Sequence, residues 1–378
     1  MKKLKRSHLK SYLAITIFFI ISASLGLFIR YPSSKEHSTI SINQNKKVLA
    51  LYSSNYGNFE YDVSWFGWKV PIISQINEFL FPFVRNPTQM KPKLGYYSLK
   101  NDNIIEKHME MIKSANIQGI LINWTKLSKN NQPEYKNQTI VMNNYPTFND
   151  RNVTETFIDI GSIGNEDPIL NIVQLAALNN ISVGLFVSTC NKSTEKIIQE
   201  IKIFQQIAND NGNPLKINDK LVIMIDDDLN FTNNVDFFRQ FYLIQFSEQC
   251  SNVYSAFQSL YSAFTCFNFS AQQFEPWRKR NFDIIPTVMP GFNESRRDLQ
   301  LLYKTIGRSD GMEYIHQWKQ AFEWGGDIII INSFNNWIQN TAIESALVER
   351  RDPEKWSGID SESFIKLTKR LSEQFHKI

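Results

Sequence analysis

The sequence predicts an α/β protein, a (β/α)8 TIM barrel that follows an N-terminal transmembrane signal anchor. Three observations support this fold class. Strand-like and helical segments alternate along residues 47–378. The four isoleucines Ile328–Ile331 form an apolar, β-branched run, typical of a parallel strand buried on both faces. The polar and aromatic stretch 333–340 follows at once, at the strand end where parallel α/β folds build ligand sites.

Length and composition limit the class of protein and its partners. A chain of 378 residues, 42% hydrophobic and 21% charged, is ordinary for a globular protein and long enough for one large barrel. The formal charge of +4 comes from the N-terminus, where seven basic residues precede the first acid, Glu36, and the remaining chain carries −3. This distribution argues against a nucleic-acid partner.

The N-terminus predicts a membrane segment. Residues 1–10 form a basic tail, expected in the cytosol, and residues 11–29 are an uncharged run of 19 residues, enough for a transmembrane anchor. The small residues 22–24 leave a cleaved signal peptide as an alternative. Either interpretation sends the rest of the chain into the secretory pathway. Residues 30–46 are predicted to be a polar stem, and residues 47–378 the barrel.

The elements of the barrel follow from local periodicity and capping signals. Strands are expected at 48–53, 119–124, 182–188, 221–225, 284–288 and 327–333, and helices at 103–115, 167–179, 193–208, 235–246, 311–324 and 361–376. Asn103 and Glu106 form a capping-box pair at the start of the first helix. One face of that helix carries Ile104, His108, Met111 and Ala115. His108 is expected to be a structural histidine rather than a proton shuttle.

No cofactor and no metal are expected, because the chain has neither a P-loop nor a GxGxxG after a strand, and its cysteines lack metal-ligand spacing. The three cysteines Cys190, Cys250 and Cys266 allow one disulfide and one free thiol. Eight N-x-S/T sequons are compatible with the secretory pathway: Asn123, Asn137, Asn152, Asn180, Asn191, Asn230, Asn268 and Asn293.

Polar and aromatic residues follow the predicted strands and should converge at one mouth of the barrel, as in a glycan site. Tyr52, Trp124, Asn335 and Trp337 are therefore predicted to bind substrate, with the aromatic rings either stacking on sugars or packing. Asp226–Asp228 follow another strand and serve either in the site or as a cap of the next loop or helix.

Four stretches in order resemble glycoside hydrolase family 99: Gly95–Trp124, Ile284–Ser295, Gly307–Tyr314 and Ile331–Glu344. That family comprises the endo-α-1,2-mannosidases of the Golgi, type II membrane proteins with a (β/α)8 catalytic barrel. The resemblance runs from about residue 48 to the end of the chain. It implies a type II protein, with a luminal C-terminal domain, in a secretory-pathway membrane such as the Golgi. It also implies that the barrel mouth recognises mannose-containing N-glycans or glycoproteins.

The resemblance breaks at the residues that would carry the chemistry. The family pattern SFNEWHEGTQIE contains two catalytic glutamates, and Asn336 and Gln339 stand at their positions here. An amide cannot exchange a proton at neutral pH, whereas glycoside hydrolysis generally needs two carboxyl groups. The family's glycine after the second glutamate is Asn340. The aspartate of a further family motif is replaced by Glu294.

Three hypotheses remain open at this point. The first is a membrane-anchored luminal protein that binds glycans without hydrolysing them. The second is an active endo-α-1,2-mannosidase-type hydrolase with relocated carboxylates, drawn from Asp226, Asp227, Asp228, Glu294 and Glu344. The third is a structural or assembly barrel without a ligand. Whether the protein is an enzyme depends on which of these holds.

Overall fold

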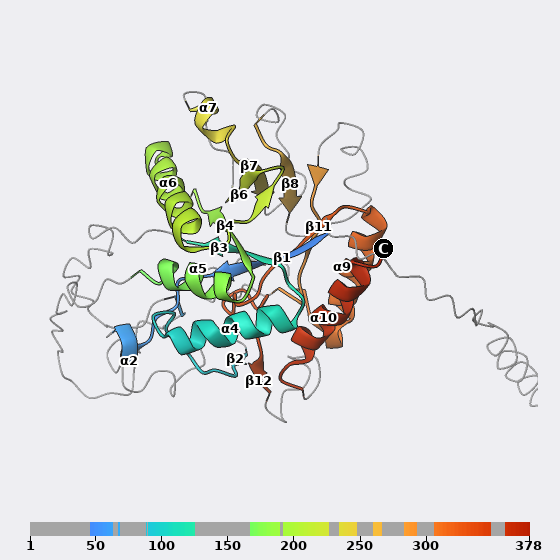
Figure 1. Ribbon diagram of the computed structural model, residues 1–378. Helices are drawn as coiled ribbons and strands as arrows, with labels where there is room; N and C mark the ends of the chain where they lie inside the picture. The colour runs from blue at the N-terminus through green and yellow to red at the C-terminus, as the bar shows by residue number, and fades with distance from the viewer. Residues whose placement is uncertain are drawn as a thin grey trace, which may run out of the picture. The chain divides into compact units, whose positions relative to one another are not determined.

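The computed structural model describes residues 46–62, 67–68, 88, 90–124, 167–189, 192–226, 234–247, 260–266, 283–292, 306–348 and 360–378 (Figure 1). All of them belong to the compact unit Ile42–Ile378. The predicted tail, the predicted anchor and all but the last residue of the predicted stem lie outside these ranges. Among the helices that the structure describes, none is long and apolar enough to cross a membrane.

The central sheet is built from parallel strands. They are β1 (Lys47–Ser53), β3 (Gly119–Asn123), β4 (Ser182–Val187), β6 (Lys220–Asp226), β7 (Tyr242–Ser247), β8 (Ala263–Cys266), β9 (Asp283–Ile284), β10 (Thr287–Val288) and β11 (Ile328–Ile331). Parallel pairing runs in the order β10, β11, β1, β3, β4, β6, β7, β8, β9. Only residues 285–286 separate β9 from β10, so the segment 283–288 pairs with β8 at one end and with β11 at the other. The result is a TIM-barrel-like α/β fold.

Helices connect and cover the strands: α2 (Phe59–Asp62), α4 (Asp102–Ser114), α5 (Ile169–Leu178), α6 (Thr194–Asn211), α7 (Val235–Phe238), α9 (Met312–Trp324) and α10 (Ser363–Phe375), with a short 3-10 helix at Ser309–Gly311. Ser193 caps α6 by accepting a hydrogen bond from the backbone N–H of Lys196. Gly325 caps the C-terminus of α9, and its φ of 79° is the left-handed conformation that glycine favours. Two smaller antiparallel pairings join β2 (Lys91–Pro92) to β12 (Ala346–Leu347) and β5 (Lys216–Ile217) to β6.

Alternation along the strands creates two separate cores. Leu49 and Leu51 on β1 belong to an inner cluster made of strand residues and of residues flanking them, with no residue from an α-helix. Their neighbours Val48, Ala50 and Tyr52 belong to the outer cluster, which includes the buried faces of the helices. Successive side chains of a strand point to opposite faces, so one strand serves both cores. Tyr52 therefore points toward the helices and not into the barrel.

Two expectations about elements were wrong. Residues 235–246 are not one helix, because α7 ends at Phe238 and β7 begins at Tyr242. β7 pairs with strands on both sides, and this tertiary pairing outweighs the helical periodicity of its sequence. β8, its neighbour, was not predicted. The cap of α4 is Asn101, whose side chain accepts from the N–H of Asn103, rather than Asn103 itself.

Gly184 on β4 provides a test of the inner core. A Cβ at this position would lie 2.8 Å from Leu121 Cδ2 and 2.9 Å from the carbonyl oxygen of Val222. We expect Gly184→Ala to lower the free energy of unfolding by about 1–3 kcal/mol through overpacking, measured by urea unfolding. In the matched control, Gly326→Ala, the new methyl group has no neighbour closer than 3.9 Å. Equal stability of the two variants would contradict the inward placement of Gly184.

Candidate functional site

The candidate site is the loop that follows β11, residues 332–345. The peptide bond between Asn332 and Ser333 is cis. Ser333 and Thr341 join the two ends of the loop. The Ser333 N–H donates to the carbonyl of Thr341 over 3.0 Å, and the hydroxyl oxygens of the two residues lie 2.9 Å apart. The Phe334 N–H donates to the carbonyl of Leu51 on β1. These contacts fix the loop at the carboxyl ends of β1 and β11.

The side chains of Asn336 and Gln339 lie side by side. Asn336 Nδ2 donates to Gln339 Oε1 over 2.8 Å, and the backbone N–H of Gln339 donates to Asn336 Oδ1 over 3.2 Å. The Asn336 N–H donates to Ser333 Oγ over 2.7 Å. Both amide residues are half-buried. The structure thus brings together the two residues that the sequence singled out, as a mutually hydrogen-bonded pair.

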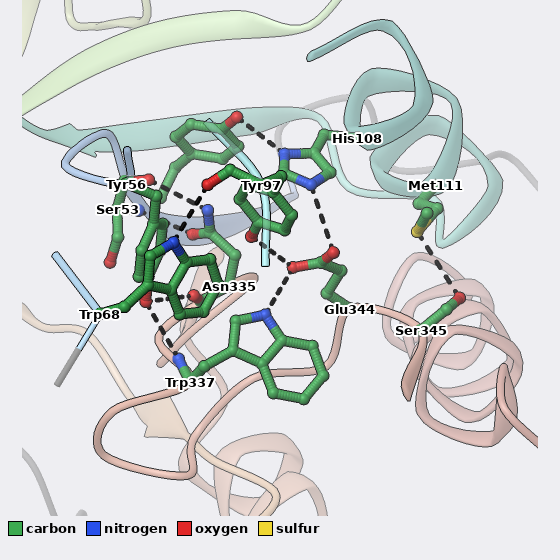
Figure 2. A network of polar contacts seen from close by, with 11 residues as sticks. Ser53, Tyr56, Trp68, Tyr97, His108, Met111, Asn335, Trp337, Glu344 and Ser345 are labelled. Carbon is green, nitrogen blue, oxygen red and sulfur yellow. Dashed lines mark hydrogen bonds and ion pairs between the residues drawn. The ribbon is translucent and has the colours of Figure 1, made fainter. Parts of the chain in front are cut away.

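Asn335 anchors the same loop to β1 (Figure 2). Its side chain accepts from the N–H of Ser53 over 2.7 Å and donates to the Ser53 carbonyl over 3.0 Å. The hydroxyl of Tyr56 donates to the carbonyl of Asn335 over 2.9 Å and lies 3.2 Å from the donating N–H of Trp337. Asn335 is fully buried, so it supports the loop and presents no amide to a ligand in this conformation.

Glu344, near the end of the loop, lies at the centre of a buried polar network (Figure 2). Its side chain is 0% exposed, and its Oε2 accepts from the hydroxyl of Tyr97 and the indole N–H of Trp337, each over 2.7 Å. Its Oε1 lies 3.3 Å from His108 Nε2, and His108 Nδ1 lies 2.9 Å from the hydroxyl of Tyr52. A proton on Nε2 satisfies both histidine contacts, because Nδ1 can then accept from Tyr52.

Burial around Glu344 also holds the phenols in their protonated form. Removal from water raises the pKa of Tyr52 and Tyr97 well above the ordinary value, and the negative charge of Glu344 raises it further. Burial likewise raises the pKa of Tyr56. All three hydroxyls therefore remain hydrogen-bond donors throughout the physiological pH range.

Asn340 and Arg308 support the far side of the loop. Asn340 adopts a φ of 56°, the left-handed conformation that asparagine tolerates better than most other non-glycine residues. Arg308 Nη2 donates to the carbonyl oxygens of Asn340 over 3.0 Å and Ala342 over 2.8 Å. Burial lowers the pKa of this guanidinium to about 9, so it remains charged at neutral pH.

The other predicted site residues are buried, hydrogen-bonded to other residues or outside the described ranges. Trp124 is 2% exposed, and its indole N–H donates to the carboxylate of Asp167. Tyr52 and Trp337 are also buried, so a sugar cannot stack on any of the three rings in this conformation. Asp226 ends β6 and accepts from the N–H of Thr189 over 2.5 Å. The remaining carboxylate candidates, Asp227, Asp228 and Glu294, lie outside the described residues.

Sequence reasoning did not assign roles to Tyr97, Trp68 or the hydroxyl of Tyr56. The indole of Trp68 donates to the carbonyl of Tyr97 over 3.0 Å and stacks on the ring of Tyr56, with the centroids 4.1 Å apart. The only available signal was that Tyr97 lies within one of the family-like stretches. His108 is fully buried on α4, and its contact with Glu344 could not be foreseen from the helix alone.

The fold and the strand-end site together define a TIM-barrel-like α/β protein, and comparisons with known proteins narrow this class. No family model matches the chain. The glycoprotein endo-α-1,2-mannosidase of Mus musculus is 22% identical, across 88% of this chain and 76% of that protein. The Xenopus laevis enzyme of the same name is 20% identical, across 88% of this chain and 78% of that protein.

Solved structures support the same fold. A family 99 endo-α-mannosidase from Bacteroides thetaiotaomicron aligns with a TM-score of 0.65 and 17% identity, across 87% of this chain and 97% of that one. A structure of the same enzyme with bis-tris propane aligns with a TM-score of 0.64. The chain is therefore glycoside hydrolase family 99-like, as its sequence motifs predicted.

The network around Glu344 provides a second test. Glu344→Gln replaces one carboxylate oxygen with an NH2 group that faces donors, so we expect the free energy of unfolding to fall by about 1–3 kcal/mol in urea unfolding. The control Glu373→Gln changes an exposed residue of α10 and should stay within about 0.5 kcal/mol of the unmodified protein. A Glu344→Gln variant as stable as the control would show that the carboxylate is not needed.

Proposed function

We propose that this chain is a membrane-anchored, luminal, endo-α-mannosidase-like protein that binds mannose-containing N-glycans and has lost hydrolysis. One observation carries the proposal: Asn336 and Gln339, which the sequence resemblance aligns with the family's catalytic glutamates, form a hydrogen-bonded amide pair in a well-anchored loop. The pair retains the capacity to hydrogen-bond sugar hydroxyls. It lacks the capacity to accept or release a proton.

Acid–base chemistry accounts for the loss of hydrolysis. The general acid protonates the leaving oxygen and its partner removes a proton, and each contribution is worth about 10²–10⁴ in rate. Replacement of both carboxylates leaves little rate enhancement. This argument rests on the alignment of Asn336 and Gln339 with the family's glutamates.

The relocated-carboxylate hypothesis receives less support from the described residues. Glu344 is fully buried, and its two oxygens face donors from Tyr97, Trp337 and His108. A carboxylate held in this way supports other side chains and does not reach a substrate. Asp226 is half-buried and accepts from Thr189, which makes it the better of the two described candidates.

The compartment is part of the same proposal. The basic tail followed by the apolar run 11–29 favours a type II anchor in a secretory-pathway membrane such as the Golgi. Cys266 at the end of β8 is disulfide-bonded, and its partner among the three cysteines lies outside the described residues. Structural disulfides are typical of oxidising compartments, which supports a luminal barrel.

Restoring the acids tests the catalytic argument. We expect the full-length protein, purified in detergent, to bind α-1,2-mannosyl oligosaccharides without cleaving them. The double variant Asn336→Glu, Gln339→Glu should gain measurable hydrolysis, followed by release of reducing sugar. The control Asn336→Gln has the same added length without an acid and should remain inactive.

Other outcomes separate the competing functions. Hydrolysis by the unmodified protein that disappears in Asp226→Asn would establish relocated carboxylates and refute the proposal. Absence of glycan binding in a correctly folded protein would favour the structural barrel.

The luminal placement has its own test at Asn180. This asparagine is exposed, adopts a φ of 58° in the turn after α5, and begins the sequon Asn180-Ile181-Ser182. In secretory cells we expect a mass shift that is removed by enzymatic deglycosylation and is smaller in Ser182→Ala. Ser182→Thr preserves the sequon and should retain the full shift. Identical masses for both variants would contradict modification at this site.

A further inference from the structure

The hydrogen bonds around Asn336 and Gln339 fix the direction in which each amide points. The backbone N–H of Gln339 can only donate, so the Asn336 atom that it contacts over 3.2 Å is the carbonyl oxygen, Oδ1. The Nδ2 of Asn336 then faces Gln339 and requires an acceptor, which is Oε1 at 2.8 Å. With Oε1 used in this way, Nε2 of Gln339 must point away from the pair.

The pair therefore presents hydrogen-bond donors. Among the described residues, Gln339 Nε2 has no hydrogen-bond partner, and it is not one of the buried polar atoms that lack one, so it reaches solvent. It carries two N–H groups, and Asn336 Nδ2 keeps one more beyond the bond to Gln339. Asn336 Oδ1 and Gln339 Oε1 each accept one hydrogen bond within the pair, which leaves one lone pair on each oxygen. A ligand at this position therefore meets three unused N–H groups against two remaining lone pairs, so donors predominate.

Ionised glutamates at these two positions would present the opposite chemistry, because a carboxylate only accepts hydrogen bonds and repels anions. The carboxylate of Glu344, in the same loop, is fully buried and faces three donors. A surface of neutral N–H donors matches an oxygen anion better than a hydroxyl, since hydrogen bonds to a charged acceptor are roughly twice as strong as neutral ones.

We infer that the Asn336–Gln339 pair recognises an oxyanion carried by the mannosyl glycan, either a phosphate ester or a carboxylate, in preference to a neutral mannose. A phosphate ester and a carboxylate share an anionic oxygen that can accept two or more hydrogen bonds from the N–H groups of the pair. This inference rests on the proposed glycan binding and specifies its ligand.

The test compares three probes that share one sugar framework: methyl α-1,2-mannobioside, its 6-phosphate, and its 6-carboxylate made by oxidation of C6. Binding to the full-length protein is measured by titration calorimetry at a fixed salt concentration. We expect at least one acidic probe to bind about tenfold more tightly than the neutral one. The two acidic arms distinguish a phosphorylated glycan from a uronate.

Two variants test the direction of the amides. Gln339→Glu removes the free donors and adds a negative charge, so the preference for the acidic probe should disappear. Asn336→Asp removes the Nδ2 donor, and the Gln339 amide should then turn to donate Nε2 to the new carboxylate and present Oε1 outward. The preference should be lost here too, although Gln339 itself is unchanged.

A control and a salt series separate polarity from simple charge. Gln374→Glu adds the same charge on an exposed residue of α10 and should keep the preference. A higher salt concentration screens the repulsion between the new carboxylate and the acidic probe. It does not restore the N–H donors that the Asn336→Asp variant lacks, so this variant should still show no preference for the acidic probe.

The outcomes distinguish this inference from the proposed function. Equal or tighter binding of the neutral probe by the unmodified protein overturns the inference and leaves glycan binding intact. Failure of all three probes to bind overturns both. A preference for acidic probes that survives in Gln339→Glu would place the oxyanion elsewhere and also overturn the inference.

Discussion

The structure of the candidate site depends on one buried carboxylate. Burying the charged side chain of Glu344 costs a free energy on the order of several kcal/mol unless hydrogen bonds replace its contacts with water. The replacements come from distant parts of the chain: His108 on α4, Tyr97 just before that helix, and Trp337 in the strand-end loop. Because all three must reach one carboxylate, the loop after β11 is held against α4 (Figure 2).

Aromatic packing makes this arrangement possible. The rings of Tyr97 and His108 meet edge to face with centroids 4.9 Å apart, and Phe334 stacks on Tyr52 at 5.9 Å. These rings exclude water, which strengthens the hydrogen bonds inside and raises the cost of leaving any one of them unmade. The network also lies on the helix-facing side of β1, because Tyr52 points outward where Leu51 points inward. The aromatic residues of the network therefore belong to the outer, helix-facing core and not to the inner core of the barrel.

The sequence was sufficient where the signal was local. The isoleucine run of β11, the parallel strands on each side of it and the proximity of Asn336 to Gln339 all follow from short-range patterns. It was insufficient where tertiary contacts decide. β7 forms a strand because β6 and β8 flank it, although its sequence has helical periodicity. The contact between Glu344 and His108 spans 236 positions, and no local pattern specifies it.

The short distance between the side chains of Asn336 and Gln339 is possible for two amides but not for two ionised carboxylates. Two ionised carboxylates cannot lie 2.8 Å apart, because like charges at that distance raise one pKa until the pair shares a proton. An amide pair meets at that distance without cost, since each side chain offers the donor or acceptor that the other lacks. The loop in this protein therefore holds Asn336 and Gln339 in an arrangement that two ionised glutamates would have to leave. Two hydrogen bonds hold the loop in place, one from Ser53 on β1 to Asn335 and one from Trp337 to Glu344. Neither involves the side chain of Asn336 or Gln339. The network that holds the loop is therefore separate from the contact between the two amide side chains.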